Sequence, residues 1–407
     1  MLRFIRFNLL LAFCTVLGHS CGPLQSSDHF HDDAEPVLQL NPWLKRLSDE
    51  YHNYLEAIAA DSLLPGFAAG IVYRDRVIHR HGYGYRHADS KETVDVHTVF
   101  RIGSLSKGFT AVLAGMMVRE GLMNWDDPVI QYIPHFSLKS KRATESLTLR
   151  HLLSHTTTLP PHAYTDLIED GWDLALMIEA LRDVDLSGLP GNVYAYQNVA
   201  FSLAGEMMAV CTGYDFGSLL EERVFLPLSM DDASSGLEEL MRNVNKAHPH
   251  WKQGGGWRAK KILNEYYNTS PAGGINASIS DMCNWLLAMN GERPEIVARD
   301  LLDTLFTPIV RTPIRARYRA QWQGLGELWY GLGWRIFERG SHRIIYHGGL
   351  VNSYRSEIAL NPATGLGVCV LMNASASVAS EVVPVFLNLC DQYADSIAMW
   401  ERERMLF

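Results

Sequence analysis

The chain has 407 residues, of which 47% are apolar and 20% are charged, and its formal net charge is −9. This balance is typical of a globular protein with a sizeable core, and the length suits one large domain or two ordinary ones. Because the net charge is mildly negative and no dense block of lysine and arginine occurs, nucleic acid is not expected as a partner.

Residues 1–21 are typical of a secretory signal. Arg3 and Arg6 precede an apolar run over residues 9–17, and small residues lead up to Cys21. The run is too short to span a membrane, so we expect a secreted protein of the bacterial periplasm or cell envelope. Cys21 also resembles the lipid-attachment position of a bacterial lipoprotein, and a lipid there would anchor the protein to the membrane.

The same junction contains GHSCG at residues 18–22, which matches G-x-S-x-G, the nucleophile motif of α/β-hydrolases. That motif needs a strand before it and a helix after it. Here a signal-like segment precedes it, and the polar, proline-containing residues 22–41 follow. We therefore interpret the match at Ser20 as chance and residues 22–41 as a linker.

The elements predicted after the linker place strands near both ends of the chain. Apolar spacing predicts a helix over residues 42–60, and two apolar strands flank a turn at Arg74-Asp75. Residues 329–373 contain four short strand-like segments, and a helical pattern follows over residues 381–400. The connections between these strands are tight, so the sheet is expected to be antiparallel.

The middle of the chain, from about residue 101 to 323, is helix-like or irregular. This order indicates a mixed α/β (α+β) fold, in which an antiparallel sheet flanked by helices is built from both chain ends and carries a helical insertion. We expect one domain over residues 42–407. Its α/β part would comprise about 42–100 and 324–407, and its all-helical part about 101–323.

A Ser-Leu-Ser-Lys run at residues 104–107 precedes a helical pattern over residues 108–120 that is apolar nearly all round, as in a buried helix. If the helix begins at Ser104, residues three apart share a face, so Ser104 lies over Lys107 while Ser106 points elsewhere. A buried lysine can be neutral and accept the serine proton. The spacing therefore favours Ser104 as a nucleophile and Lys107 as its activator; the alternative is a Ser104 that only caps the helix.

Tyr196-Gln197-Asn198 forms a second motif, on a turn that opens another apolar helix. A tyrosine beside a lysine can exist partly as phenolate and relay a proton, and an asparagine amide can hold both the lysine and a substrate carbonyl. Tyr194 is a rival for Tyr196, but it lacks an asparagine two residues later. The alternative interpretation is a turn tyrosine that packs on its neighbours.

A third motif, His347-Gly348-Gly349, lies on a predicted strand. Glycines on a strand let another backbone or a ligand approach closely. A backbone N–H just after them could face the N–H of Ser104 and stabilise an oxyanion. The alternative is a bend at a sheet edge with a core histidine.

Ser-x-x-Lys, Tyr-x-Asn and a strand His/Lys-x-Gly, in this order, resemble the penicillin-recognising serine hydrolases, in particular the class C β-lactamase branch with its DD-peptidase, D-aminopeptidase and esterase relatives. Blocks such as LTLRHLLSHTTTLP, PAGGINASISDMCNW and YGLGW also look like this family. The resemblance extends from about Pro42 to the C-terminus. It implies a β-lactamase/transpeptidase-like fold, with a mixed α/β domain, an all-helical domain and a cleft between them.

The resemblance also implies a mechanism. Ser104 would attack a carbonyl and form an acyl-enzyme, Lys107 and Tyr196 would move protons, and water or another acceptor would release the acyl group. No metal or organic cofactor is implied. The implied substrate-binding and oxyanion positions are Asn198, His347, Gly348, Gly349 and Leu350.

Two departures from the family pattern bear on the substrate. His347-Gly348 stands where many β-lactamases have lysine and a hydroxyl residue, which help hold a β-lactam carboxylate, and no basic residue follows residue 373 until Arg402. We therefore expect a serine hydrolase of the esterase or DD-peptidase kind, acting on a small-molecule or peptidoglycan-type substrate. The alternatives are a class C-like β-lactamase and a penicillin- or peptidoglycan-binding module without turnover. No sequence feature indicates an oligomeric state.

Overall fold

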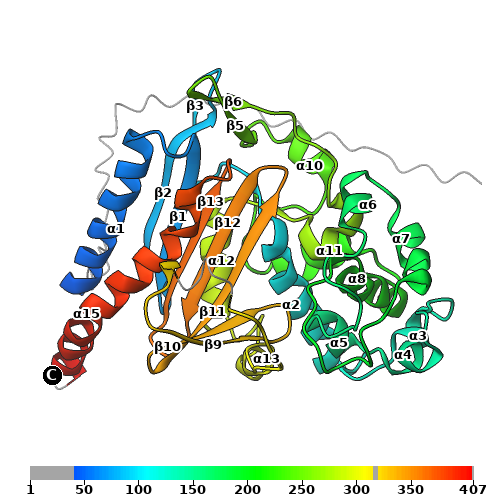
Figure 1. Ribbon diagram of the computed structural model, residues 1–407. Coiled ribbons are helices and arrows are strands. Elements are labelled where there is room, and N and C mark those ends of the chain that lie inside the picture. Colours follow the sequence, from blue (N-terminus) through cyan, green and yellow to red (C-terminus); the bar gives the residue numbers. More distant parts are fainter. Residues whose placement is uncertain (1–40, 315–319, 406–407) are drawn as a thin grey trace, which may run out of the picture. The chain divides into compact units, whose positions relative to one another are not determined.

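The computed structural model describes residues 41–314 and 320–405 (Figure 1). The expectations of a signal over residues 1–21, a lipid on Cys21 and a linker up to residue 40 lie outside the described residues. Within the described ranges, no helix is both long enough and apolar enough to cross a bilayer.

Nine described strands form one antiparallel sheet. They are β1 (Gly66–Tyr73), β2 (Arg76–His87), β3 (Glu92–Thr93), β8 (Val310–Arg311), β9 (Leu325–Tyr330), β10 (Arg335–Arg339), β11 (His342–Val351), β12 (Tyr354–Asn361) and β13 (Leu366–Met372). Their order is β3-β2-β1-β13-β12-β11-β10-β9-β8. The two ends of the chain meet where β1 pairs with β13, from Phe67 opposite Met372 to Tyr73 opposite Leu366. The expected antiparallel sheet built from both chain ends is thereby confirmed.

Strand β1 is buried along its whole length because helices cover both faces of the sheet. On one face, side chains such as Phe67 and Ile71 pack against α1 (Pro42–Ala60) and α15 (Val382–Met405). On the other face, Ala68 and Val72 join a core that includes α12 (Ile279–Met289). Strands buried on both faces read as continuous apolar runs, which is the pattern of β1. The α1 and α15 pair lies to one side of the sheet in Figure 1.

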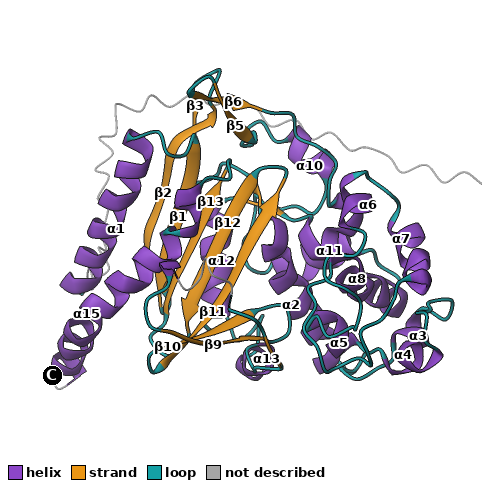
Figure 2. Ribbon diagram, viewed as in Figure 1, coloured by secondary structure: helices purple, strands orange, loops and turns teal. Residues whose placement is uncertain are grey.

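A block of mostly short helices lies beside the sheet, around the buried helix α8 (Figure 2). The described α-helices outside the α1, α12 and α15 layers are α2 (Ser106–Arg119), α3 (Val129–Tyr132), α4 (Lys141–Ser146), α5 (Leu149–Leu153), α6 (Thr165–Glu169), α7 (Leu174–Ala180), α8 (Asn198–Thr212), α9 (Phe216–Leu220), α10 (Leu237–Arg242), α11 (Ser270–Gly273) and α13 (Arg299–Leu305). Helix α2 is buried nearly all round, as its apolar pattern predicts.

Small strands also occur within the middle of the chain. They are β4 (Phe100–Arg101), which pairs with β7 (Asn276–Ala277), and β5 (His250–Gln253), which pairs with β6 (Gly256–Ala259). The β5–β6 hairpin lies in the part of the chain that the sequence predicts to be helix-like or irregular (Figure 2). Gly254 and Gly255 have φ angles of +59° and +80°, which permits the tight turn between the two strands.

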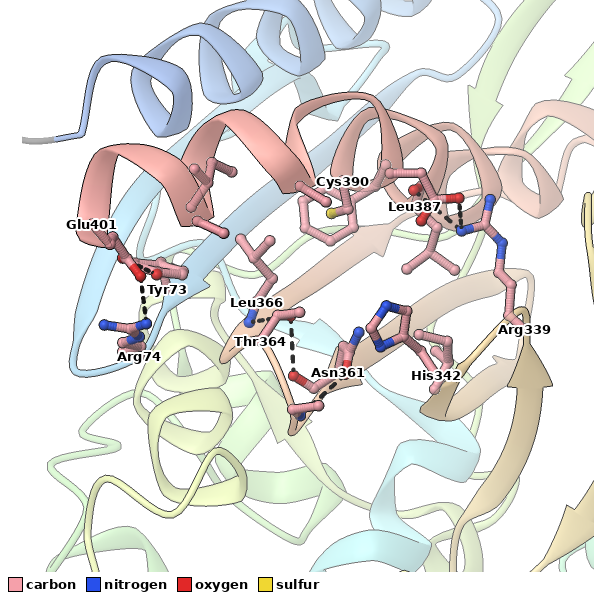
Figure 3. A pocket seen from close by; sticks show the side chains of 17 residues that line it. Tyr73, Arg74, Arg339, His342, Asn361, Thr364, Leu366, Leu387, Cys390 and Glu401 are labelled. Carbon is pink, nitrogen blue, oxygen red and sulfur yellow. Dashed lines mark hydrogen bonds and ion pairs between the residues drawn. The ribbon is translucent and has the colours of Figure 1, made fainter. Parts of the chain in front are cut away.

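Helix α15 leaves a cavity of about 200 Å³ between itself and the sheet (Figure 3). On the α15 side, the cavity is lined by residues that include the small Ala394 and Ala398. The charged groups at its rim pair with one another, since Arg74 donates to Glu401 and Arg339 donates to Asp391. The cavity is lined by none of the residues that the sequence predicts for the site, so it is separate from the chemistry considered below.

Candidate active site

Ser104 lies on a 3₁₀ turn, Gly103–Leu105, that runs directly into α2. The α-helix therefore begins two residues later than the sequence pattern predicts. The expected pairing of Ser104 with Lys107 is nevertheless present, because Lys107 Nζ lies 3.5 Å from Ser104 Oγ. The Ser104 side chain is partly exposed, whereas Lys107 is fully buried.

Ser106, the second serine of the run, is fully buried, and its hydroxyl stabilises the turn by hydrogen bonds. Its hydroxyl donates to the carbonyl of Gly103 at 2.7 Å and accepts from the backbone N–H of Ile275 at 3.1 Å. Both hydrogen-bonding functions of this hydroxyl are therefore satisfied inside the protein. Of the two serines, Ser104 is the one whose hydroxyl is both accessible and next to the lysine.

Lys107 donates to two oxygens, Asn198 Oδ1 at 2.7 Å and the carbonyl of Ala272 at 2.8 Å. Burial lowers the pKa of Lys107 well below its ordinary value, and the Arg335 guanidinium lowers it further. The neutral amine is thereby favoured. A neutral amine has two N–H bonds and one lone pair, so donation to Asn198 and Ala272 leaves the lone pair to face Ser104.

Tyr196 lies beside this pair. Lys107 Nζ is 4.7 Å from the centre of the Tyr196 ring. Burial raises the pKa of Tyr196, while the nearby Arg335 and Ser104 side chains act in the opposite direction. The raised pKa favours the neutral phenol over the partial phenolate that the sequence allows. Tyr194 instead stacks near other aromatic rings, with its centroid 5.6 Å from that of Tyr330.

Asn198 is the first residue of α8, and its position explains the Tyr-x-Asn spacing. The intervening Gln197 caps the helix, because its side-chain oxygen accepts from the backbone N–H of Val199 at 3.1 Å. The cap sets the start of α8, so that Tyr196 on the preceding extended segment and Asn198 on the first helical turn both reach Lys107.

The third motif lies on β11, as predicted. His347 is buried, with Nδ1 3.0 Å from the carbonyl of Gly348 and Nε2 3.1 Å from the Tyr330 hydroxyl. A carbonyl oxygen can only accept, so Nδ1 carries the proton and Nε2 accepts from Tyr330. Burial lowers the pKa of His347 well below its ordinary value, and the nearby Arg335 and Lys107 lower it further. His347 is therefore a neutral residue that orders the strand.

The two glycines of β11 differ in their surroundings. A side chain at Gly349 would collide with the carbonyl oxygen of Ile102 and the hydroxyl of Ser356, so only glycine lets β11 lie against the turn that carries Ser104. From the other side, a Cβ on Gly103 would lie 3.0 Å from the backbone nitrogen of Leu350. The fold thus brings the Leu350 amide next to the Ser104 turn.

Gly349→Ala is expected to lower the free energy of unfolding by about 2 kcal/mol, because the added methyl group must push β11 away from Ile102. The same displacement separates Leu350 from the Ser104 turn. Urea unfolding measures the loss. Gly256→Ala is the matched control, because a Cβ there meets no atom within 4 Å. Equal stability of the two variants would contradict the close packing of β11.

Several groups at the site belong to residues that were not predicted from the sequence. The Arg335 guanidinium carbon lies 5.5 Å from the ring centre of Tyr196 and 5.6 Å from that of Tyr330. The His155 ring lies 4.2 Å from that of Tyr196, and the carbonyl of Ala272 accepts from Lys107. Tyr330 is the first residue of the block YGLGW and Ala272 lies in PAGG, so for these two the only sequence indication was membership of a family-like block; Arg335 directly follows YGLGW.

With this geometry established, comparison with known proteins identifies the family. The family model described as Beta-lactamase matches residues 52–384. The chain belongs to the Beta-lactamase family. The recognition made from the three motifs is confirmed.

The curated relatives of this Beta-lactamase family member are distant. Beta-lactamase-like protein 2 of Dictyostelium discoideum is 25% identical over 340 residues, which is 80% of this chain and 59% of that protein. Unguisins hydrolase ungD' of Aspergillus campestris (strain IBT 28561) is 24% identical, over 77% of this chain and 59% of that protein. Protein flp of Staphylococcus aureus (strain MRSA252) is 24% identical, over 83% and 65%. The chain thus spans about three fifths of the length of these relatives.

Among solved structures, the octameric penicillin-binding protein homologue from Pyrococcus abyssi aligns with a TM-score of 0.72 and 23% identity. The alignment covers 84% of this chain and 77% of that chain. At this identity the likeness concerns the fold. It confirms the β-lactamase/transpeptidase-like fold of this Beta-lactamase family member.

Proposed function

We propose that this Beta-lactamase family member is a serine hydrolase that forms an acyl-enzyme at Ser104 on an ester, amide or β-lactam carbonyl. The observation that carries the proposal is the position of Lys107. Its Nζ lies 2.7 Å from Asn198 Oδ1, 2.8 Å from the carbonyl of Ala272 and 3.5 Å from Ser104 Oγ, so that as a neutral amine it would donate to the first two and direct its lone pair to Ser104. A buried neutral amine in this arrangement is a general base for a serine nucleophile.

In the first step, the Ser104 proton passes to Lys107 Nζ while Oγ bonds to the substrate carbonyl carbon. The carbonyl oxygen becomes an oxyanion, and we assign its stabilisation to the backbone N–H groups of Ser104 and Leu350. The close approach of Leu350 to Gly103 supports this assignment. Asn198 would then serve both to orient Lys107 and to contact the substrate, as its hydrogen bond to the lysine allows.

In the second step, the bond from the carbonyl carbon to the leaving group breaks. Tyr196, whose raised pKa favours the neutral phenol, donates its proton to the leaving atom, and the Lys107 ammonium returns a proton to Tyr196. Water or another acceptor then releases the acyl group from Ser104 by the reverse exchange of protons. This scheme uses no metal or organic cofactor.

The third motif favours esterase or DD-peptidase-like activity over an efficient β-lactamase. His347 is neutral and bonded to Tyr330, and Gly348 has no hydroxyl, so this strand offers neither of the groups that help hold a β-lactam carboxylate. A class C-like β-lactamase and a binding module without turnover are the alternatives. On the basis of the signal-like residues 1–21, we propose that the protein acts outside the cytoplasm, which cell fractionation of the full chain tests.

The proposal is tested by intact-protein mass spectrometry after incubation with a penicillin and with a short-chain nitrophenyl ester, for the wild type and Ser104→Ala. The expected result is an acyl adduct or hydrolysed product with the wild type and neither with Ser104→Ala. A stable penicillin adduct without turnover would favour the binding module. Undiminished hydrolysis by Ser104→Ala would overturn the proposal.

A further inference from the structure

The segment that carries Tyr196 is bound on both sides of the tyrosine by a single residue, His155. The backbone N–H of Ala195 donates to the carbonyl of His155 at 2.9 Å, and the backbone N–H of Gln197 donates to its ring nitrogen Nδ1 at 3.2 Å. In extended backbone, N–H groups two residues apart point in the same direction, so one neighbour can accept from both. His155 therefore fixes the chain immediately before and immediately after Tyr196.

The Tyr196 ring is also in contact with His155. The centres of the two rings are 4.2 Å apart, and their planes are inclined by 41°. On the opposite edge of the segment, the carbonyl of Tyr196 accepts from the backbone N–H of His162 at 2.8 Å. The position of the Tyr196 phenol thus depends on His155 through the backbone and through the ring.

The backbone of His155 is itself unusual. The residue follows the end of α5, is fully buried and has a φ angle of +57°. This left-handed conformation is uncommon for residues other than glycine and costs free energy, and such residues cluster at functional sites. In this conformation both the carbonyl and the ring of His155 reach the segment 195–197.

The hydrogen bond from Gln197 determines the tautomer of the His155 ring. Nδ1 accepts a proton there, so the ring proton is on Nε2. Within residues 41–314 and 320–405, the buried Nε2 has no hydrogen-bond partner. Burial lowers the pKa of His155 well below its ordinary value, and the nearby charges of Lys107 and Arg335 lower it further. A neutral ring with a free lone pair on Nδ1 is thereby maintained.

We propose that His155 is a positioning residue that holds the phenol of Tyr196 in place for proton transfer to the leaving group. The proposal rests on the function proposed for Ser104 and deepens it, because Tyr196 must contact the leaving atom to protonate it. A misplacement of about 1 Å can lower a rate about 100-fold. His155 acts through Tyr196, since its Nδ1 is occupied by Gln197.

Two butyrate esters test this proposal, ethyl butyrate and 4-nitrophenyl butyrate. Ethoxide must receive a proton as it leaves, whereas nitrophenolate leaves as a stable anion. Both esters give the same acyl-enzyme, so their kcat/KM values compare only the acylation steps. His155→Leu, which removes the acceptor for Gln197, should lower kcat/KM about 100-fold or more for the ethyl ester and less than about tenfold for the nitrophenyl ester. Equal losses on both esters would overturn the proposal.

His155→Asn tests whether the acceptor is the part of the side chain that matters. Its amide oxygen can take the place of Nδ1, so a folded His155→Asn protein should regain at least about tenfold of the loss on the ethyl ester. No recovery would overturn the proposal. His151→Leu is the matched control in the same block, because the His151 ring bonds locally to Thr148 at 3.0 Å. It should leave the ratio of the two kcat/KM values unchanged.

A double variant tests whether His155 acts through Tyr196. Tyr196→Phe should itself lower kcat/KM for the ethyl ester, and adding His155→Leu should then lower it by less than about threefold more. A further loss of about 100-fold would mean that His155 acts independently of Tyr196, and would overturn the proposal.

Nitrogen-15 NMR of the histidine-labelled wild type provides a readout that needs neither turnover nor a folded variant. The expected signal of His155 at pH 7 is that of a neutral ring protonated on Nε2. A ring protonated on Nδ1 could not accept from Gln197 and would overturn the proposal. A wild type that hydrolyses neither ester would instead contradict the function proposed for Ser104, so the two failures are distinguishable.

Discussion

Ser104→Ala is expected to lower kcat for ester hydrolysis by about 10⁴-fold or more, because the only atom that bonds to the substrate carbonyl is lost. Its effect on stability should stay within about 1 kcal/mol, since the side chain is partly exposed and its contact with Lys107 is long at 3.5 Å. Initial rates with a nitrophenyl ester and urea unfolding measure the two effects on the same preparation.

Ser106→Ala is the matched control, two residues away in the same run, and the opposite result is expected. The substitution leaves the buried Ile275 N–H without its partner and removes one of the hydrogen bonds that the Gly103 carbonyl accepts, which keeps the one from the backbone N–H of residue 106. We expect a loss of about 1–3 kcal/mol in the free energy of unfolding, with acyl-enzyme formation retained. Loss of the adduct in a stably folded Ser106→Ala protein, with the adduct retained in Ser104→Ala, would reassign the nucleophile.

Because of Lys107, the free energy of unfolding is expected to rise with pH. Its pKa is lowered in the folded chain by burial, whereas in the unfolded chain it is about 10.4. Between these two values the unfolded state holds one more proton than the folded state, so raising the pH favours folding by about 1.4 kcal/mol per pH unit. Below the folded pKa both states are protonated and this dependence disappears.

The measurement is the difference in free energy of unfolding between the wild type and Lys107→Met, from urea curves at pH 7.5, 8.5 and 9.5. The difference should change in favour of the wild type as the pH rises, by up to about 1.4 kcal/mol per pH unit. Lys141→Met replaces an exposed lysine on α4 and should show a constant difference. A constant difference for Lys107→Met as well would mean that the buried lysine is charged.

The protonation of Lys107 is also expected to determine how kcat/KM depends on pH. Lys107 accepts the Ser104 proton only as a neutral amine, so kcat/KM should rise as the pH passes upward through its lowered pKa. Lys107→Met should remove this rise together with most of the activity, by about 10³-fold or more. If kcat/KM of Lys107→Met still rose with pH as in the wild type, the rise would be due to the protonation of another group.

The sequence by itself determined the fold class, the antiparallel sheet made from both chain ends and the family. These follow from signals that are local in the chain. Continuous apolar runs such as β1, the fully apolar pattern of α2 and the fixed spacing of Ser104 to Lys107 depend on neighbours within one turn or one strand. The residues of the three motifs lie close together in the fold, around Lys107 and β11.

Only the tertiary structure determined which groups contact Lys107 and how the pKa values of the site residues are shifted. Lys107 meets Ala272 and Asn198, which are 165 and 91 positions away, and no periodic pattern links residues that distant. Burial, which lowers the pKa of Lys107 and raises that of Tyr196, is a property of the packed interior and not of any short segment. Arg335 reaches the site only because β10 pairs beside β11, and that pairing exists only once the whole sheet has formed.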